Sequence, residues 1–254
     1  PWTPRERAGA MVWPEPGEFL WSEDAQGLIA NGDLVTVAGG IPMGWEMVGG
    51  GATYIRGGGL AEGAGELTVD EGSGTFICPT GEPAAARPLD LLEIMDGSDD
   101  EPGRYLIRSV TEDGLAARLR RKPAESAAGL PFKLLRSSGC PAVAGGCAIE
   151  CRGKSYWQSA VRGLQQGEYR LGFYFRAYDP AAMKAKGGPG CAARVDVALE
   201  VSEAPVSTGP LVTAWHWQRG WLDFTVLETG DLLLQPRAEG DTVVEFTGFS
   251  LQRG

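Results

Sequence analysis

Two long runs of strictly alternating residues are the strongest constraint on how this chain folds. In "EYRLGFYFRA" one side of an extended strand carries Tyr169, Leu171, Phe173 and Phe175, and the other carries Arg170, Gly172, Tyr174 and Arg176. "RVDVALEV" repeats the pattern, with Val195 and Val197 opposite Arg194 and Asp196. A period of two indicates a strand with one buried face, and sheets of that kind are typically antiparallel. The sequence therefore predicts an all-β protein.

Composition and turn spacing favour a sandwich. Glycine contributes 38 of 254 residues, and 43% of the chain is hydrophobic, which indicates many turns around short strands that still bury a core. The segment "WLDFTVLETGDLLLQPRAEGDTVVEFTGFSL" contains three further strands, separated by turns at "ETGD" and "RAEGD". This spacing is typical of a β-sandwich or jelly roll.

The front half of the chain differs in texture and indicates a second unit. In "RPLDLLEIMDGSDDEPGRYLIRSVTEDGLAARLRR" a small core can form from Leu89, Leu91, Ile94, Tyr105, Ile107 and Val110. We expect three parts: an extended N-terminal arm over residues 1–30, a jelly roll from 31–59 and 130–254, and an inserted small β subdomain over 60–129. The arm carries Trp2, Trp13 and Trp21, and exposed indoles lower solubility, so we expect the arm to dock on a partner.

Charge and motifs exclude several classes of function. The net charge is −10, and the basic residues form no dense cluster beyond "RLRRK", so a nucleic-acid partner is not expected. No apolar run reaches the ~20 residues of a membrane span, and the opening "PWTPRERAGAMVW" lacks a signal-peptide h-region. The chain has no P-loop, G-x-S-x-G or H-E-x-x-H motif, and Asp196 with Glu200 on one strand face is also what a solvated face looks like. We therefore expect a protein that is not an enzyme.

The five cysteines leave two interpretations open. They are Cys78, Cys140, Cys147, Cys151 and Cys191. They are either buried thiols or include a local disulfide such as Cys140 with Cys147. Zinc is not expected, because His216 is the single histidine and no C-x-x-C pair is present.

Three stretches carry a resemblance to a known family. "NGDLVTVAGGIPMGWEMVGGG" resembles the opening of galactose-binding-like carbohydrate-binding modules through Asn31, Gly32, Pro42, Gly44 and Trp45. "YWQSAVRGLQQGEYRLGFYFRA" resembles a Tyr-rich strand of that family, and the last hairpin is similar to the family's final one. The resemblance covers 31–56 and 131–253 and implies a jelly roll that recognises polysaccharide without catalysis and without a cofactor. Many such modules hold a structural Ca²⁺ through an Asp-Asp pair in the last strand. Here Thr247 and Gly248 stand there, which puts calcium in question.

A second resemblance concerns the inserted part, 60–129. It is similar to a small β-barrel unit of structural proteins from tailed phages and gene transfer agents. Together the two resemblances imply a head spike or decoration protein on a virion surface, or an extracellular protein, that mediates host attachment. Its arm would contact other virion proteins, and several copies would be displayed together or form a homo-oligomer. The alternative is a purely structural assembly protein that binds no glycan.

Candidate site residues follow from the chemistry of sugar recognition, which needs aromatic faces for C–H groups and polar groups for hydroxyls. The predicted carbohydrate-binding residues are Trp157, Gln158, Tyr174, Arg176, Trp215 and Trp217. Alternation places Tyr174 and Arg176 on the face of their strand that points away from the core. In "TAWHWQRGW", Trp215 and Trp217 share one face of an extended segment and could form a sugar platform or cap the core.

Overall fold

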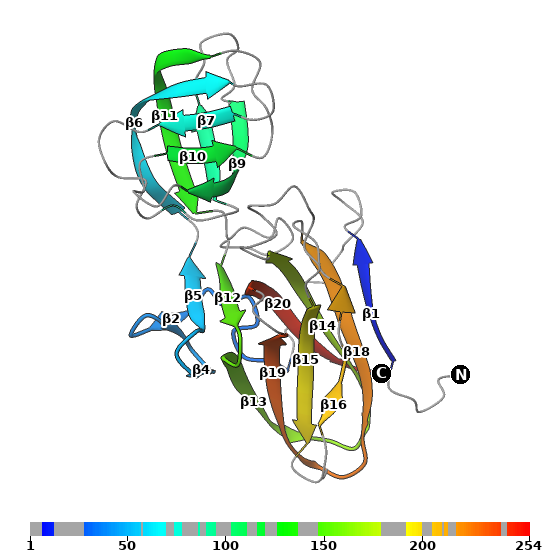
Figure 1. The fold of residues 1–254 in the computed structure, drawn as a ribbon. Helices are drawn as coiled ribbons and strands as arrows, with labels where there is room; N and C mark the ends of the chain where they lie inside the picture. Colours follow the sequence, from blue (N-terminus) through cyan, green and yellow to red (C-terminus); the bar gives the residue numbers. More distant parts are fainter. Residues whose placement is uncertain are drawn as a thin grey trace. The chain divides into compact units, whose positions relative to one another are not determined.

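The computed structural model describes two compact units made of β-strands (Figure 1). The described residues are 7–12, 28–56, 58–69, 74–77, 86, 90–94, 103–110, 116–119, 126–136, 147–178, 192–199, 205–209, 211–212, 217–239 and 243–254. Over these ranges there is no helix, so none crosses a membrane, and every strand pair is antiparallel. The prediction of an all-β protein is confirmed.

The first unit is a sandwich of two sheets (Figure 1). The first sheet has the order β1 (Arg7–Val12), β18 (Gln218–Val226), β14 (Gly167–Tyr178), β20 (Val243–Arg253), β12 (Cys147–Arg152) and β5 (Thr53–Arg56). The second sheet has the order β16 (Val206–Ser207), β15 (Ala192–Leu199), β19 (Gly230–Ala238), β13 (Tyr156–Leu164) and β4 (Trp45–Val48), with β17 (Leu211–Val212) also paired to β15. From β12 to β15, and again from β18 to β20, consecutive strands alternate between the two sheets, which is the connectivity of a jelly roll.

The core lies between the two sheets and is built by the predicted alternation. Tyr169, Leu171, Phe173 and Phe175 of β14 are all buried in one cluster with Val195 and Val197 of β15. Phe246 and Phe249 of β20 contact Phe173, with ring centroids 6.2 Å away in each case. A Cβ on Gly220 of β18 would overlap the Phe173 ring, so this close approach requires glycine.

Part of the expected arm belongs to the sandwich itself. β1 runs antiparallel to β18 as the edge strand of the first sheet, with Arg7 opposite Asp223 and Val12 opposite Gln218. The three tryptophans of the arm lie outside the described residues. Docking of the arm on another protein stays a prediction.

The segment from Asn31 to Trp45 forms a hairpin that is attached to the core of the sandwich. The Asn31 side chain, at φ 55°, donates to the carbonyls of Thr36 and Met43 at 2.9 and 3.0 Å and accepts from the Thr36 N–H at 2.9 Å. These bonds close the hairpin of β2 (Val37–Ala38) and β3 (Ile41–Pro42). The Trp45 ring then packs on Phe249 at 4.7 Å, which ties the hairpin to the core.

The second unit is a closed six-stranded barrel, and its described residues lie within Arg56–Ser138. Its strands are β6 (Gly58–Val69), β7 (Gly74–Ile77), β8 (Leu91–Ile94), β9 (Gly103–Val110), β10 (Ala116–Leu119) and β11 (Ala127–Arg136). The boundary expected at residue 130 divides β11, which in the structure pairs along its length with β6 and β8. β11 therefore belongs to the barrel, because these pairings complete the closed ring.

The small core expected from the sequence is largely present in the barrel. Ile94 and Ile107 are buried, and Tyr105 and Val110 pack against them. On β8 the core residue is Leu92 rather than Leu91, because Leu92 and Ile94 share one face of the strand. Leu89 lies outside the described residues.

Two of the cysteines are buried thiols of β12. Cys147 and Cys151 match the first interpretation, and the disulfide considered for Cys147 is not formed. Cys151 donates its Sγ–H to the carbonyl of Pro236 in β19 at 3.3 Å and so links the two sheets. Burial raises the pKa of the Cys151 thiol well above its usual range, so the group stays protonated at neutral pH.

Candidate functional site

Trp157 is a core residue. Its side chain is buried among the inner faces of the two sheets, and its indole N–H donates to the Glu150 carbonyl at 3.1 Å. Because the ring is enclosed and its N–H is bonded, no face is available to a saccharide. The predicted ligand-facing role of Trp157 is corrected to a packing role.

Arg176 and Trp217 come together on the outer side of the first sheet, Tyr174 lies two residues before Arg176 on the same strand face, and all three are buried. The guanidinium carbon of Arg176 lies 4.8 Å from the Trp217 ring centroid, and Arg176 Nε lies 2.6 Å from Glu245 Oε2. The side chains of Arg176 and Glu245 are 5% and 1% exposed. The expectation that alternation opens these side chains to solvent is therefore wrong, because all three are buried.

Of the remaining predicted residues, Gln158 lies on an accessible face and Trp215 lies outside the described residues. Gln158 is half-buried on β13, one residue after the core residue Trp157. Alternation therefore turns it to the outer face of the second sheet. The rest of the candidate site is built around Gln158.

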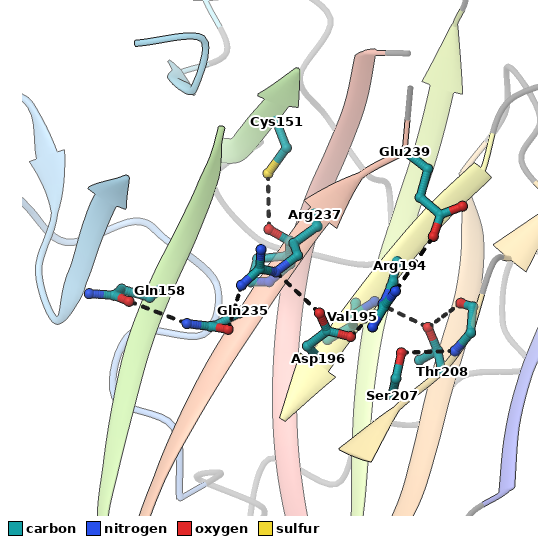
Figure 2. Close-up of polar contacts among 12 residues, drawn as sticks. Cys151, Gln158, Arg194, Val195, Asp196, Ser207, Thr208, Gln235, Arg237 and Glu239 are labelled. Atoms are coloured by element: carbon teal, nitrogen blue, oxygen red, sulfur yellow. Dashed lines mark hydrogen bonds and ion pairs between the residues drawn. The ribbon is translucent and has the colours of Figure 1, made fainter. Parts of the chain in front are cut away.

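Strand register places two rows of side chains across this outer face. The first row joins Glu46, Gln158, Gln235, Asp196 and Ser207, and the second joins Val48, Tyr156, Arg237 and Arg194. Figure 2 shows Gln158, Gln235, Arg237, Asp196, Arg194 and Glu239 following one another across β13, β19 and β15. We call Glu46, Tyr156, Gln158, Arg194, Asp196, Gln235, Arg237 and Glu239 the polar face.

A directional chain of hydrogen bonds crosses the polar face. Arg237 Nη2 donates to Gln235 Oε1 at 2.7 Å, and Gln235 Nε2 lies 3.5 Å from Gln158 Oε1. Gln158 Nε2 then donates to Glu46 Oε2 at 2.6 Å. The chain runs from a cation to a carboxylate, so each bond polarises the next and both amides are held in one orientation.

An ion cluster closes the other end of the polar face. Asp196, whose side chain is 6% exposed, lies 2.6 Å from Arg194 Nε and 3.2 Å from Arg237 Nε. The contact to Arg237 has ion-pair distance without hydrogen-bond alignment, so Arg237 Nε has no hydrogen-bond acceptor in the described part of the chain. Arg194 also faces Glu239 at 3.8 Å, and the Arg237 guanidinium stacks on the Tyr156 ring at 3.9 Å. The arginine heads are thereby fixed while about a third of each side chain stays exposed.

This arrangement supplies the chemistry of hydroxyl recognition. Gln158 and Gln235 each have a second amide N–H that the hydrogen-bond chain does not use. Glu46 likewise has a second carboxylate oxygen outside that chain. The polar face therefore presents donors near its middle and an acceptor at its β4 end, on an accessible sheet surface.

Of the polar face, the sequence predicted only Gln158 as a binding residue. The residues it missed are Glu46, Tyr156, Arg194, Asp196, Gln235, Arg237 and Glu239. The signal was present, since "RVDVALEV" places Arg194 beside Asp196 on one strand face. In "DLLLQPRAE", Gln235 and Arg237 likewise alternate with buried Leu234 and Pro236. What the sequence does not contain is the register that aligns these strands.

Metal ligation finds no support in the described ranges. No group of three or more His, Cys, Asp or Glu residues there has the geometry to hold an ion. At the position where the resembling family places its calcium carboxylate, the Thr247 hydroxyl donates to the Cys147 carbonyl at 2.7 Å. Thr247 therefore acts as a structural bridge from β20 to β12.

Comparisons with known proteins give distant structural similarity only. No protein-family model matches the chain, and no curated protein matches it. Among solved structures, the carbohydrate-binding module TmCBM61, in complex with β-1,4-galactotriose, is similar over 43% of this chain and 72% of its own, with 19% identity and a TM-score of 0.32. The enzymatically active domain of bacteriophage CBA120 tailspike protein 4 is similar over 90% of this chain and 21% of its own, with 6% identity and a TM-score of 0.35. An isomalto-dextranase of Arthrobacter globiformis T6, complexed with panose, is similar over 81% of this chain and 35% of its own, with 13% identity and a TM-score of 0.26. All three TM-scores are below 0.5, so these similarities carry no argument about function.

Proposed function

We propose that the sandwich binds carbohydrate through the polar face and that it does so without catalysis. The observation that carries the proposal is the ordered chain from Arg237 through Gln235 and Gln158 to Glu46 on an accessible sheet surface. Sugar hydroxyls both donate and accept, so a surface with fixed amide N–H groups and carboxylate oxygens fits them.

The fixed geometry of the polar face favours binding. Side chains that are already held by neighbours lose little conformational freedom when a ligand arrives. Arg237 is fixed by its stacking on Tyr156 and by Asp196, and through its bond to Gln235 it orients the amides. Tyr156 supplies the apolar surface, although one side of its ring is occupied by the guanidinium.

The binding is expected to be weak per site. Lectin-like contacts on an open sheet face give a dissociation constant in the mM to µM range, about −4 to −8 kcal/mol. Useful adhesion then needs several copies on one surface. We further propose that the protein attaches a virion to a host polysaccharide. The basis of this step is the resemblance of the sequence to carbohydrate-binding modules and to phage structural proteins.

The test is a glycan array followed by affinity electrophoresis against the polysaccharides that score. Gln158→Ala combined with Gln235→Ala should weaken retention roughly tenfold, because two ligand hydrogen bonds, one from each amide, are lost. Both side chains lie on the outer face of the sheet, so the thermal unfolding midpoint should change little.

The matched control is Gln166→Ala, which removes an exposed glutamine side chain from the turn between β13 and β14. Retention by Gln166→Ala should equal that of the unchanged chain. No retention of any glycan by the unchanged, folded chain would reject the proposal. Full retention by the double variant would move binding away from the polar face.

The alternative function, assembly without glycan binding, is favoured by a different observation. Exposed apolar side chains concentrate between residues 28 and 47 of the sandwich. An array without any signal, together with a stable complex formed through that segment, would support the assembly function.

A further inference from the structure

The described part of the chain concentrates its exposed large apolar side chains in one short segment. Seven such side chains are exposed, and five of them fall within residues 28–47: Leu28, Val35, Ile41, Met43 and Met47. Exposed fractions range from 40% at Ile41 to 52% at Met43. Single exposed apolar residues are ordinary, whereas a local concentration marks an interaction site.

These side chains are exposed on a fixed framework. Ile41 lies opposite Ala38 in the β2–β3 hairpin, and the Met43 N–H donates to the Thr36 carbonyl at 2.8 Å. Ile41 lies on β3 of the hairpin and Met43 begins the turn that follows it, and both side chains are exposed, 40% and 52%. We call Val35, Ile41 and Met43 the hairpin surface.

The anchors of the hairpin lie in the sandwich core. Leu34 is fully buried at φ 65°, and its carbonyl accepts from the Tyr54 hydroxyl at 3.0 Å. The Gly32 carbonyl accepts from the Phe249 N–H at 2.9 Å, and a Cβ on Gly32 would overlap the Phe249 carbonyl. A left-handed leucine is costly and persists only where its surroundings impose it. The hairpin surface is therefore held outward by these contacts.

The acidic character of the segment that carries the hairpin surface favours a partner with basic residues. Residues 28–55 contain no Lys, Arg or His, and their two charged residues are Asp33 and Glu46. The whole chain carries a net charge of −10. A second copy would bring Asp33 and a net charge of −10 against the same charges, which disfavours self-association. A partner with basic residues around an apolar centre is complementary in both respects.

We propose that the hairpin surface is a docking site for a different protein, one whose contact surface has an apolar centre and a Lys/Arg rim. The proposal is independent of carbohydrate binding, because Asp33, Val35, Ile41 and Met43 are not part of the polar face. Ile41 and Met43 supply the buried centre of the contact, and Asp33 supplies the charge that orients the partner.

The test uses two synthetic amphipathic peptides with identical leucine positions, one with lysines and one with glutamates at the flanking positions. Binding to the full chain is measured by fluorescence anisotropy at near-physiological ionic strength. The lysine peptide should bind and the glutamate peptide should not. Ile41→Ser combined with Met43→Ser should weaken the lysine peptide roughly tenfold or more.

Two further variants separate specific docking from general attraction to an acidic protein. Asp33→Asn keeps an oxygen that can accept from the Val35 N–H, now 3.3 Å from Asp33 Oδ1, and should weaken the lysine peptide about two- to threefold. Leu227→Ser removes an exposed apolar side chain outside the segment, 70% exposed, and should have no effect.

Three results would overturn the proposal. The glutamate peptide could bind as tightly as the lysine peptide, or the Ile41/Met43 double variant could bind the lysine peptide unchanged. Sedimentation velocity could also show a concentration-dependent dimer that the double variant loses, in which case the occupant is a second copy. Since all the changed side chains are exposed, an unchanged unfolding midpoint is expected for each variant.

Discussion

The two outer faces of the sandwich carry similar side chains in opposite environments. On the first sheet, Arg176 and Glu245 form an ion pair at 2.6 Å with both side chains almost fully buried. On the second sheet, Asp196 holds Arg194 at 2.6 Å and Arg237 at 3.2 Å while both arginines stay about one-third exposed. Alternation along a strand therefore tells which side chains leave the core. It does not tell whether they reach solvent.

This difference changes what each ion pair can contribute. A buried pair is costly to desolvate, and removing one partner leaves an unfavourable buried charge. A pair whose arginine reaches water contributes little to stability but keeps donors in place for a ligand. The buried pair of the first sheet is therefore expected to act in stability, and the proposed carbohydrate binding uses the exposed pairs of the second sheet.

The largest expected effect tests the buried pair of the first sheet. Arg176→Met removes the guanidinium next to Glu245 and should lower the free energy of unfolding by about 3–5 kcal/mol. Urea denaturation monitored by tryptophan fluorescence measures the change.

The matched variant for this pair is Arg176→Met with Glu245→Leu. It should recover most of the loss, because it buries no charge. A loss below about 1 kcal/mol for the single variant would mean that Arg176 is solvated, and the contrast between the two faces would fail.

A smaller effect is expected on the outer face of the second sheet. Asp196→Asn removes the charge shared by Arg194 and Arg237 but keeps an acceptor oxygen, and should cost about 1–2 kcal/mol of stability. Glycan retention should fall more than stability does, because Arg237 then loses one of the contacts that fix it for Gln235. Equal retention with lower stability would show that the ion cluster is purely structural.

The smallest effect is expected at a half-open position of the first sheet. Arg170 donates to Asp223 through Nε at 2.6 Å and Nη2 at 2.9 Å, and this bonding raises the pKa of Arg170. Its side chain is 44% exposed, so water can take the place of the guanidinium next to Asp223, whose side chain is 9% exposed. Arg170→Ala should therefore cost about 1 kcal/mol by thermal denaturation. A cost like that of Arg176→Met would mean that the whole outer face of the first sheet is sealed.

Much of the fold follows from local pattern, and little of the site does. The inward side chains of β14 and the three last strands were predicted, because period-two alternation and glycine turns are local properties of the chain. Tyr174 and Arg176 were assigned to an open face, because alternation gives the face that a side chain occupies and not its burial there. The boundary at residue 130 was misplaced, because β11 is recognisable as a barrel strand only through its partners β6 and β8.

The sequence by itself determined the strands, their inner faces and the antiparallel sandwich, since these depend on apolar residues at every second position. Tertiary structure alone decided which outer face is accessible and which side chains become neighbours there. Gln158 and Gln235 are 77 residues apart in the chain and meet only because β13 pairs with β19. Register between distant strands is a cooperative property of the packed sheets, and no short stretch of sequence encodes it.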